Sequence, residues 1–375
     1  MAFGGIVSAA RTNVRNTADQ GPYPGCMSTS ARRWTAGAIA LLLGAGPGLG
    51  CTTFVLRDGG MVLFGKNYDW SLGDGLLVVN PRGLERTALV EPGVRAAAWT
   101  SRYGSVTFNQ YGVASPSGGI NEAGLAIELM WLDESRYPDA DQRPVVGNLE
   151  WIQYQLDRNA TVAEVIASDD EVRIADNAPL HYLVADRSGD VAVVEFLGGR
   201  MVARHGKDVP VPALANDPYA DALLSWQRGA DSRSRFSRAG RRALDFHASG
   251  ERARSLDYAF ATLRSVAQDA TQWSIVYDLR ASELFFRTHG HEAIRKLALG
   301  GLDFGCGAGV RAVDLEAPGP DLQAALRPLT AERHRSFLAA VYRKTPFLAN
   351  TPPARIDQLA SQPLGARCAL PAPAR

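Results

Sequence analysis

The sequence predicts an α+β fold in which antiparallel β-hairpins stack between helices. Segments with strand-like composition begin the folded part and return after a helical stretch, all within one long domain without internal repeats. Two hairpin signals support an antiparallel arrangement. Gly59-Gly60 separates two strand-like runs, and a second pair of runs occupies residues 274–287.

Composition narrows the class of protein. The 375 residues carry a formal net charge of +1, and charged residues make up 21% of the chain, whereas a general nucleic-acid binder needs a basic excess. Beyond the leader, no stretch approaches the roughly 18 apolar residues of a membrane span. The length is sufficient for a large buried core.

The first 50 residues resemble an export leader that is removed. A basic pair at 32–33 precedes an apolar run at 36–45, and small residues Gly48 and Gly50 follow. A leader counted from Met27 has ordinary length, so the true start stays open between the first methionine and Met27. The expected location is the periplasm or the cell exterior.

Cleavage after Gly50 would make Cys51 the first residue, with a thiol and a free α-amino group side by side. A competing interpretation makes Cys51 the lipid-modified cysteine of a lipoprotein, which would block the amine. Gly48 argues against it, because such signals usually carry Leu at that position. In an exported protein, Cys306 and Cys368 could pair and leave Cys51 free. Paired metal-type cysteine spacings are absent, so no structural zinc site is expected.

The stretch from 51 to 69 predicts a hairpin with a definite register. If the residues that flank the two-glycine turn pair with each other, Cys51 lies opposite Tyr68, and Lys66 and Asp69 lie within two positions of the thiol. A cation and a carboxylate beside a thiol tune its pKa and orient its amine. The alternative is an ordinary hairpin with a buried cysteine and two solvated charges.

The following segments continue the pattern. Strands with glycine punctuation extend to residue 132, with a turn at 121–124. Apolar residues recur at helical spacing over 147–175, and strands return over 181–204. The sequence does not decide whether the Glu128 side chain, near the end of the first strand-rich region, reaches a pocket or lies on the surface. His181 is predicted to be structural.

The second half of the chain mixes helices with one hairpin. A strand leads through Asp217-Pro218 into a helix. In the basic stretch that follows, the arginines from Arg233 to Arg242, except Arg235, are predicted to form a solvated face rather than a nucleic-acid patch. The later elements are a helix near 256–267, the hairpin strands 274–279 and 283–287, and helical pieces at 321–327 and 331–342. The domain is predicted to span 51–345, and the Pro/Ala-rich tail 346–375 to be poorly packed.

Four separated motifs together resemble the choloylglycine hydrolase family. They are CTTFVL…FGKNYDW at 51–70, GGINEAGLAIELMW at 118–131, LANDP at 214–218 and SRF at 234–236. The resemblance covers most of residues 51 to about 300. The family includes bile salt hydrolases, penicillin V acylases and related linear amide hydrolases, which are N-terminal nucleophile (Ntn) enzymes. It implies a four-layer αββα sandwich of antiparallel sheets between helices, and neither a metal nor an organic cofactor.

The resemblance also assigns roles to residues. Cys51 matches the nucleophile, with its own α-amine as general base, and Asp69 matches the aspartate that holds this amine. Asn216 matches the asparagine whose NH₂ stabilises the oxyanion, and Arg235 matches the arginine that organises the charges. Lys66 stands where the family usually has arginine, so it keeps the charge but loses the planar fork.

Two tryptophans are predicted to line the substrate pocket. Trp131 stands where many bile salt hydrolases have asparagine, and its backbone N–H is expected to be the second oxyanion donor. With Trp70, it resembles the Gram-negative branch of the family, which is linked to cleavage of penicillin V and N-acyl-homoserine lactones. Core packing is the alternative for both side chains.

The sequence therefore predicts a hydrolase that cleaves a linear amide bond through a thioester on Cys51. Its expected substrate is a small N-acyl compound such as penicillin V, an N-acyl-homoserine lactone or a bile-salt conjugate. An acyltransferase on the same scaffold and an acylated, non-catalytic lipoprotein are the alternatives. No nucleic acid is an expected partner, and a homotetramer is among the assemblies that the resemblance allows.

Overall fold

The computed structural model describes residues 50–91, 93–248, 251–319 and 321–369. They belong to one compact unit that spans Gly44–Arg375. The predicted leader, apart from Gly50, and the last six residues of the predicted tail lie outside the described residues. Within these ranges, no helix is both long enough and apolar enough to cross a membrane.

The first sheet contains the hairpin that begins at the cysteine. Its six strands are all antiparallel to their neighbours and run in the order β14-β1-β2-β15-β16-β17. Asp58 pairs with Met61, and Thr52 pairs with Asn67, which confirms the predicted hairpin register. The strands are β14 (Ala213–Leu214), β1 (Thr52–Asp58), β2 (Met61–Asp69), β15 (Thr271–Asp278), β16 (Glu283–Thr288) and β17 (Arg295–Ala298).

The second sheet has nine antiparallel strands in the order β13-β12-β11-β8-β7-β6-β3-β18-β19. They are β13 (Arg200–His205), β12 (Val191–Leu197), β11 (Leu180–Ala185), β8 (Ala126–Trp131), β7 (Pro116–Asn121), β6 (Ser105–Asn109), β3 (Leu76–Asn80), β18 (Arg311–Asp314) and β19 (Arg327–Pro328). Two small sheets complete the strands: β20 (Arg367–Cys368) with β4 (Leu84–Thr87) and β5 (Ala98–Thr100), and β9 (Val145–Val146) with β10 (Arg173–Ile174).

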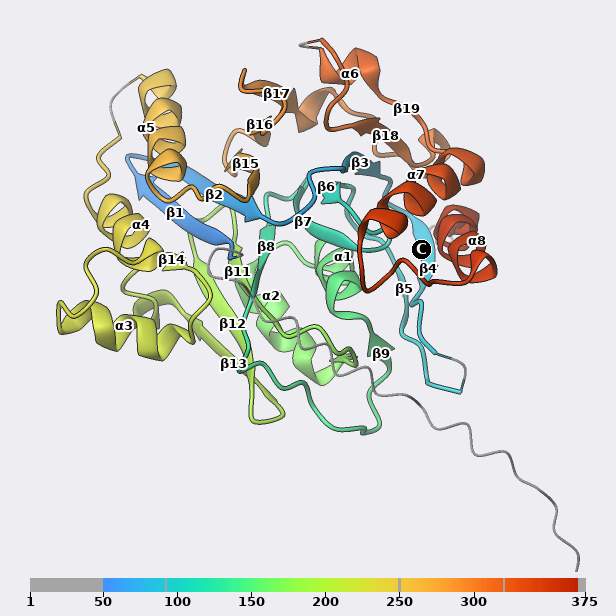
Figure 1. Ribbon diagram of the computed structural model, residues 1–375, viewed down its shortest axis with the longest axis horizontal. Coiled ribbons are helices and arrows are strands. Elements are labelled where there is room, and N and C mark those ends of the chain that lie inside the picture. Colours follow the sequence, from blue (N-terminus) through green and yellow to red (C-terminus); the bar gives the residue numbers. More distant parts are fainter. Residues whose placement is uncertain (1–49, 92, 249–250, 320, 370–375) are drawn as a thin grey trace, which may run out of the picture. The chain divides into compact units, whose positions relative to one another are not determined.

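Helices cover the outer faces of the two large sheets (Figure 1). The helices α4 (Arg235–Leu244) and α5 (Arg252–Ser265) contact β1, β2 and β15. On the nine-stranded sheet, α1 (Asn148–Arg158) and α2 (Val162–Ala167) contact β7, β8 and β12. The predicted four-layer αββα arrangement is confirmed. The other helices are α3 (Tyr219–Gln227), α6 (Leu322–Ala325), α7 (Ala331–Lys344) and α8 (Pro353–Ser361).

Strand β8 shows how alternation divides the core. Ala126 and Met130 join the cluster between the two sheets, whereas Ile127 and Leu129 join the cluster beneath α1 and α2. Because successive side chains of a strand point to opposite faces, Glu128 lies on the same face as Ala126 and Met130. Glu128 is 1% exposed, so it does not occupy the surface position that the sequence left open.

The arginines of 233–242 other than Arg235 lie mainly on an exposed side, as predicted, but the same stretch also forms a helix, α4, which the sequence did not predict. Ser234 caps the helix by accepting a hydrogen bond from the Ser237 N–H. Phe236, Ala239 and Ala243 are buried, and the arginines lie between them along the chain. The helix packs one apolar stripe on the sheet and leaves its charges on the other side.

The predicted poor packing of the tail is wrong for residues 346–369. Helix α8 packs on α7, where Ala360 joins Leu338 and Val341 in a small apolar cluster. Strand β20 pairs with β4, and the predicted disulfide between Cys306 and Cys368 is confirmed. A short amphipathic helix and a covalent cross-link thus hold a segment that its composition alone suggested was loose.

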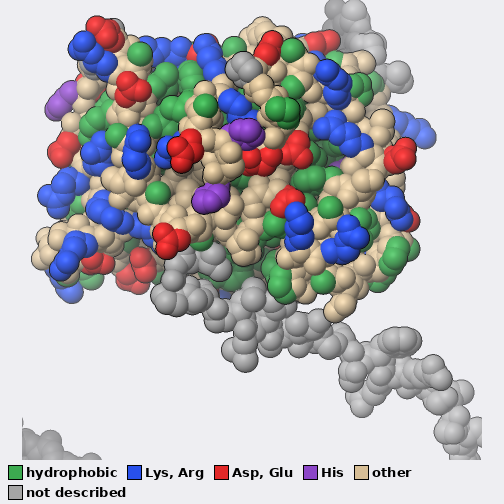
Figure 2. Space-filling model, turned by 45° about the horizontal axis from the view of Figure 1, so that its top comes forward, with side chains coloured by type: hydrophobic (Ala, Val, Ile, Leu, Met, Phe, Trp, Pro, Cys, Tyr) green, Lys and Arg blue, Asp and Glu red, His purple; other side chains and the backbone are tan. Residues whose placement is uncertain are grey.

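Charges of both signs are interspersed on the face shown in Figure 2. Lys and Arg side chains alternate there with Asp and Glu, and hydrophobic side chains are scattered among them. This face therefore carries no extended field of one sign of the kind that steers polyanions.

Candidate active site

The sheet order brings distant segments to the start of β1. Cys51 directly precedes β1, and Asp69 ends the neighbouring strand β2. On the other side, β14 pairs with β1 through Leu214 and Thr53, so Asn216 follows two residues later. Arg235 is the first residue of α4, which packs on β1.

The Cys51 thiol is buried and free of any disulfide. Burial raises the pKa of this thiol, and the Lys66 ammonium is the largest influence in the opposite direction. The Asp69 carboxylate also raises the pKa, whereas the Asp69 backbone N–H and the Arg235 guanidinium lower it. The thiolate thus depends on the positive charges and the donor that surround it.

Arg235 links the cysteine segment to Asn216. Its Nη1 donates to the carbonyl oxygens of Gly50 and Cys51 at 2.5 and 2.6 Å, and to the Thr52 hydroxyl at 2.8 Å. Its Nη2 donates to Asn216 Oδ1 at 2.8 Å. A planar guanidinium can span both sets of acceptors at once, which an ammonium cannot.

The bond from Arg235 fixes the orientation of the Asn216 amide. Because Oδ1 faces the arginine, the NH₂ points the other way and donates to the Trp131 carbonyl oxygen at 2.8 Å. The second hydrogen of this NH₂ can donate to an oxyanion. His181 supports the same loop, because its Nε2 lies 2.9 Å from the carbonyl oxygen of Ala215.

Asp69 has two partners that the sequence analysis missed. The Thr271 hydroxyl donates to Oδ1 at 2.5 Å, and Gln268 Nε2 donates to Oδ2 at 2.7 Å. Gln268 Nε2 also donates to the Gly50 carbonyl oxygen at 2.6 Å. Burial raises the pKa of Asp69, while these two hydrogen bonds and the nearby cations act against it. The pairing of Thr271 in β15 with Asp69 in β2 would have identified the threonine as a partner, but this pairing becomes visible only when the sheet is assembled.

Lys66 lies behind the cysteine, between the two sheets, and its side chain is 0% exposed. Its Nζ contacts the Leu129 carbonyl oxygen, lies 3.6 Å from Glu128 Oε2 and 3.9 Å from Met130 Sδ. The residue is therefore a buried cation rather than a solvated one, which excludes the ordinary-hairpin alternative for this position.

The two predicted pocket tryptophans are partly buried. Trp70 packs at the edge of the core between the sheets, and its Nε1 donates to the Tyr111 hydroxyl at 2.7 Å. Trp131 packs at the edge of the core beneath α1 and α2, and its Nε1 donates to Asp133 Oδ1 at 2.6 Å. Both indoles keep an accessible part, but only Trp70 packs against the cluster that contains Cys51, whereas Trp131 packs on the opposite face of β8.

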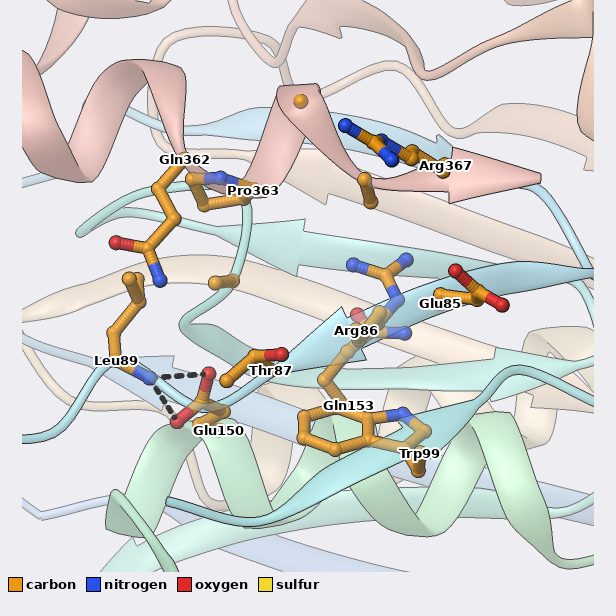
Figure 3. A pocket seen from close by; sticks show the side chains of 13 residues that line it. Glu85, Arg86, Thr87, Leu89, Trp99, Glu150, Gln153, Gln362, Pro363 and Arg367 are labelled. Atoms are coloured by element: carbon orange, nitrogen blue, oxygen red, sulfur yellow. Dashed lines mark hydrogen bonds between the residues drawn. The ribbon is translucent and has the colours of Figure 1, made fainter. Parts of the chain in front are cut away.

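A separate cavity of about 290 Å³ contains none of the predicted site residues. It lies between β4, β5, α1 and the C-terminal residues 362–367. Figure 3 shows Glu150 beneath it, with both carboxylate oxygens accepting from the Leu89 N–H at 3.1 Å. The predicted site and this cavity are thus different places in the fold.

Known proteins resemble the chain in sequence and in structure. Residues 51–226 match the family described as linear amide C-N hydrolases, choloylglycine hydrolase family. A penicillin V acylase from Pectobacterium atrosepticum is 33% identical over 211 residues, which are 50% of this chain and 54% of that protein. The match thus spans about half the length of this relative.

Solved structures extend the likeness beyond that segment. A penicillin V acylase from Agrobacterium tumefaciens has a TM-score of 0.66 and 28% identity, and the match covers 75% of this chain and 98% of that one. A single-residue variant of a conjugated bile acid hydrolase from Clostridium perfringens has a TM-score of 0.60 at 16% identity, over 72% and 98% of the two chains, and shares the fold. Sequence and fold agree: residues 51–226 match the choloylglycine hydrolase family, and the chain is similar in fold to penicillin V acylase and conjugated bile acid hydrolase.

Proposed function

We propose that this protein is an exported N-terminal nucleophile hydrolase that cleaves the linear amide bond of an N-acyl compound. One observation carries the proposal. A free thiol, an arginine fork and an oriented asparagine amide converge on Cys51, the residue that signal cleavage would make N-terminal. The match of residues 51–226 to the family of linear amide C-N hydrolases supports the reaction class.

The reaction begins with the α-amine of Cys51, whose ordinary pKa of roughly 8 suits a base near neutral pH. The amine takes the thiol proton, and the thiolate forms a bond to the amide carbonyl carbon. The second N–H of Asn216 stabilises the oxyanion, a type of contact typically worth about 100- to 1000-fold in turnover. The C–N bond then breaks as the α-ammonium returns its proton to the leaving amine.

The thioester that remains is hydrolysed by water. The same α-amine takes a proton from the water, whose oxygen bonds to the acyl carbon. The C–S bond breaks, and the thiolate recovers its proton. An acid and an amine are released, and the enzyme returns to its starting state.

Gly50 supports a requirement for processing. Its carbonyl oxygen accepts hydrogen bonds from both Arg235 and Gln268 in the uncleaved chain. Removal of Gly50 would free both donors beside the new α-amine, and Asp69 would remain beside them as a carboxylate partner for the ammonium form. The uncleaved chain, in which the nitrogen of Cys51 is an amide, is therefore inactive in this proposal.

The substrate's acyl part is hydrophobic or aromatic in this proposal. Trp70 directly follows Asp69, and the Trp131 carbonyl oxygen accepts from Asn216, so both tryptophans adjoin site residues and each carries a flat apolar indole. Penicillin V, an N-acyl-homoserine lactone and a bile-salt conjugate each join such a part to an amide, and they form the panel to test.

The test starts with the protein secreted by a bacterial host. N-terminal sequencing and intact mass are expected to show an unmodified Cys51 at position one, and mass spectrometry of the panel to show the free acid. A lipid on Cys51 would contradict the proposal, as would a processed enzyme that hydrolyses no amide. Acyl transfer to an added amine in preference to water would favour the acyltransferase. Cys51→Ser is the matched inactive control.

A further inference from the structure

A buried charge pair lies behind the nucleophile. The Lys66 side chain is 0% exposed and the Glu128 side chain 2% exposed, and Nζ lies 3.6 Å from Oε2. The Tyr277 hydroxyl donates to Oε1 of the same carboxylate at 2.6 Å. The three residues come from β2, β8 and β15, so the cluster bridges the two sheets.

We infer that Glu128 is a positioning residue that supplies the counter-charge for the buried Lys66 side chain and so holds it behind Cys51. An ammonium removed from water is stable only with a counter-charge and hydrogen-bond acceptors. Glu128 provides the counter-charge, and the Leu129 carbonyl provides an acceptor. The charge on Lys66 then favours the thiolate of Cys51. The inference uses the proposed function only in taking this thiol as the nucleophile.

The neighbouring strand is shaped to admit this carboxylate. Gly118 of β7 is the direct cross-strand partner of Glu128. A Cβ atom at Gly118 would overlap the carboxylate carbon and both carboxylate oxygens of Glu128. The carboxylate therefore lies over the bare backbone of β7, in space that any larger residue at position 118 would fill.

If residue 128 served packing alone, an apolar side chain would fill its place at a lower free-energy cost than a glutamate. The neighbours Ala126 and Met130 on the same face of β8 are apolar, and a buried carboxylate carries a desolvation penalty. Burial raises the pKa of Glu128 to about 7, while Lys66 and the Tyr277 hydroxyl act in the other direction. The carboxylate also contributes, as a minor influence after burial, to the raised pKa of Tyr68 on β2.

The placement of Glu128 therefore predicts that its effect on the reactivity of the Cys51 thiol depends on pH. Above pH 7 the carboxylate is ionised and supports Lys66, and below pH 7 it is neutral, much like a glutamine. Glu128→Gln and the natural protein should then behave alike near pH 6 and diverge toward pH 8.5. A purely structural role would lower the thiol reactivity equally at every pH or leave it unchanged.

The test measures alkylation of Cys51 by iodoacetamide in the secreted protein between pH 6 and 9, followed by intact mass. We expect Glu128→Gln to react about tenfold more slowly at pH 8.5, which corresponds to a thiol pKa about one unit higher. Tyr277→Phe removes one hydrogen bond to the carboxylate and should show a smaller loss in the same direction. Thermal melting checks that each variant is folded.

A double-mutant cycle identifies the route of the effect. If Glu128 acts through Lys66, Glu128→Gln should change nothing further in a Lys66→Met background. Rates within twofold of the natural protein across the pH range would overturn the inference, as would a cycle in which the two effects multiply. If Glu128→Gln does not fold, an unchanged profile in folded Tyr277→Phe would overturn it instead. A Cys51 thiol that resists alkylation at every pH would do so too.

Alkylation reports the thiol itself and needs no substrate. A protein that hydrolyses no amide, yet shows the expected divergence between Glu128→Gln and the natural protein, would contradict the proposed function and leave the role of Glu128 intact.

Discussion

At the scale of single residues, one guanidinium organises the candidate site. Arg235 reaches the backbone on both sides of the Gly50–Cys51 bond with one nitrogen and the Asn216 amide with the other. The asparagine is thereby turned so that its NH₂, not its oxygen, faces the site. The direction of an amide is decided by its hydrogen-bond partners, so Arg235 determines what Asn216 can stabilise.

This orientation predicts the effect of removing the amide. Asn216→Ala should lower kcat for amide hydrolysis by about 100- to 1000-fold, because an oxyanion donor acts mainly in the transition state. KM should change little. Steady-state kinetics of the processed enzyme measure both constants, and Asn177→Ala, in an exposed loop, is the matched control. A rise in KM at unchanged kcat would assign Asn216 to substrate binding instead.

At the scale of elements, hairpins were easier to predict than helices. The 51–69 hairpin depends on a two-glycine turn and on local alternation, so its register follows from neighbouring residues. Helix α4 was missed because its apolar stripe consists mostly of alanines, with Phe236 as the large member. Such a stripe becomes recognisable as a core face only against the sheet that it covers.

The start of α1 predicts a pH-dependent stability. Burial raises the pKa of Glu150 from 4.5 to about 7, and the Leu89 N–H is the main opposing influence. The folded state therefore holds this proton between about pH 4.5 and 7 while the unfolded state has lost it. Its contribution is fully present below pH 4.5 and is lost as the pH rises through 7, a change on the order of 3 kcal/mol.

Glu150→Gln should remove this dependence. The free energy of unfolding of the variant, relative to the natural protein, should rise by about 3 kcal/mol from pH 4.5 to pH 8. Urea unfolding at several pH values measures the difference. Glu91→Gln removes an exposed carboxylate near Leu89, and its stability should vary with pH as that of the natural protein does. If the stability of Glu150→Gln varies with pH in parallel with the natural protein, Glu150 is not the source of the dependence.

At the scale of the whole unit, two sheets share one core and the C-terminal segment is fastened to them. The Cys306–Cys368 disulfide joins residues 62 positions apart, and β20 and α8 add backbone pairing and apolar contacts. The cross-link restricts the unfolded chain more than the folded one. Its contribution is therefore to stability rather than to the chemistry at Cys51.

Replacement of both cysteines by serine should lower the free energy of unfolding by about 4 kcal/mol, from the loop length. Amide hydrolysis at 25 °C should be retained. Urea unfolding with and without dithiothreitol measures the loss, and Cys51→Ser, which keeps the disulfide, should respond to the reductant as the natural protein does. A natural protein that is indifferent to reduction would show that strand pairing and helix packing suffice.

The sequence by itself determined the class of fold, the first hairpin with its register, and the set of motifs that meets at Cys51. These depend on local patterns: a turn, an alternation, and short runs of particular residues. Tertiary structure decided the partners. Gln268 and Thr271 reach Asp69 from about 200 positions away, and the direction of Glu128 depends on which face of β8 meets the other sheet. Such contacts follow from the register between strands and the packing of layers, and both arise only when the whole core assembles.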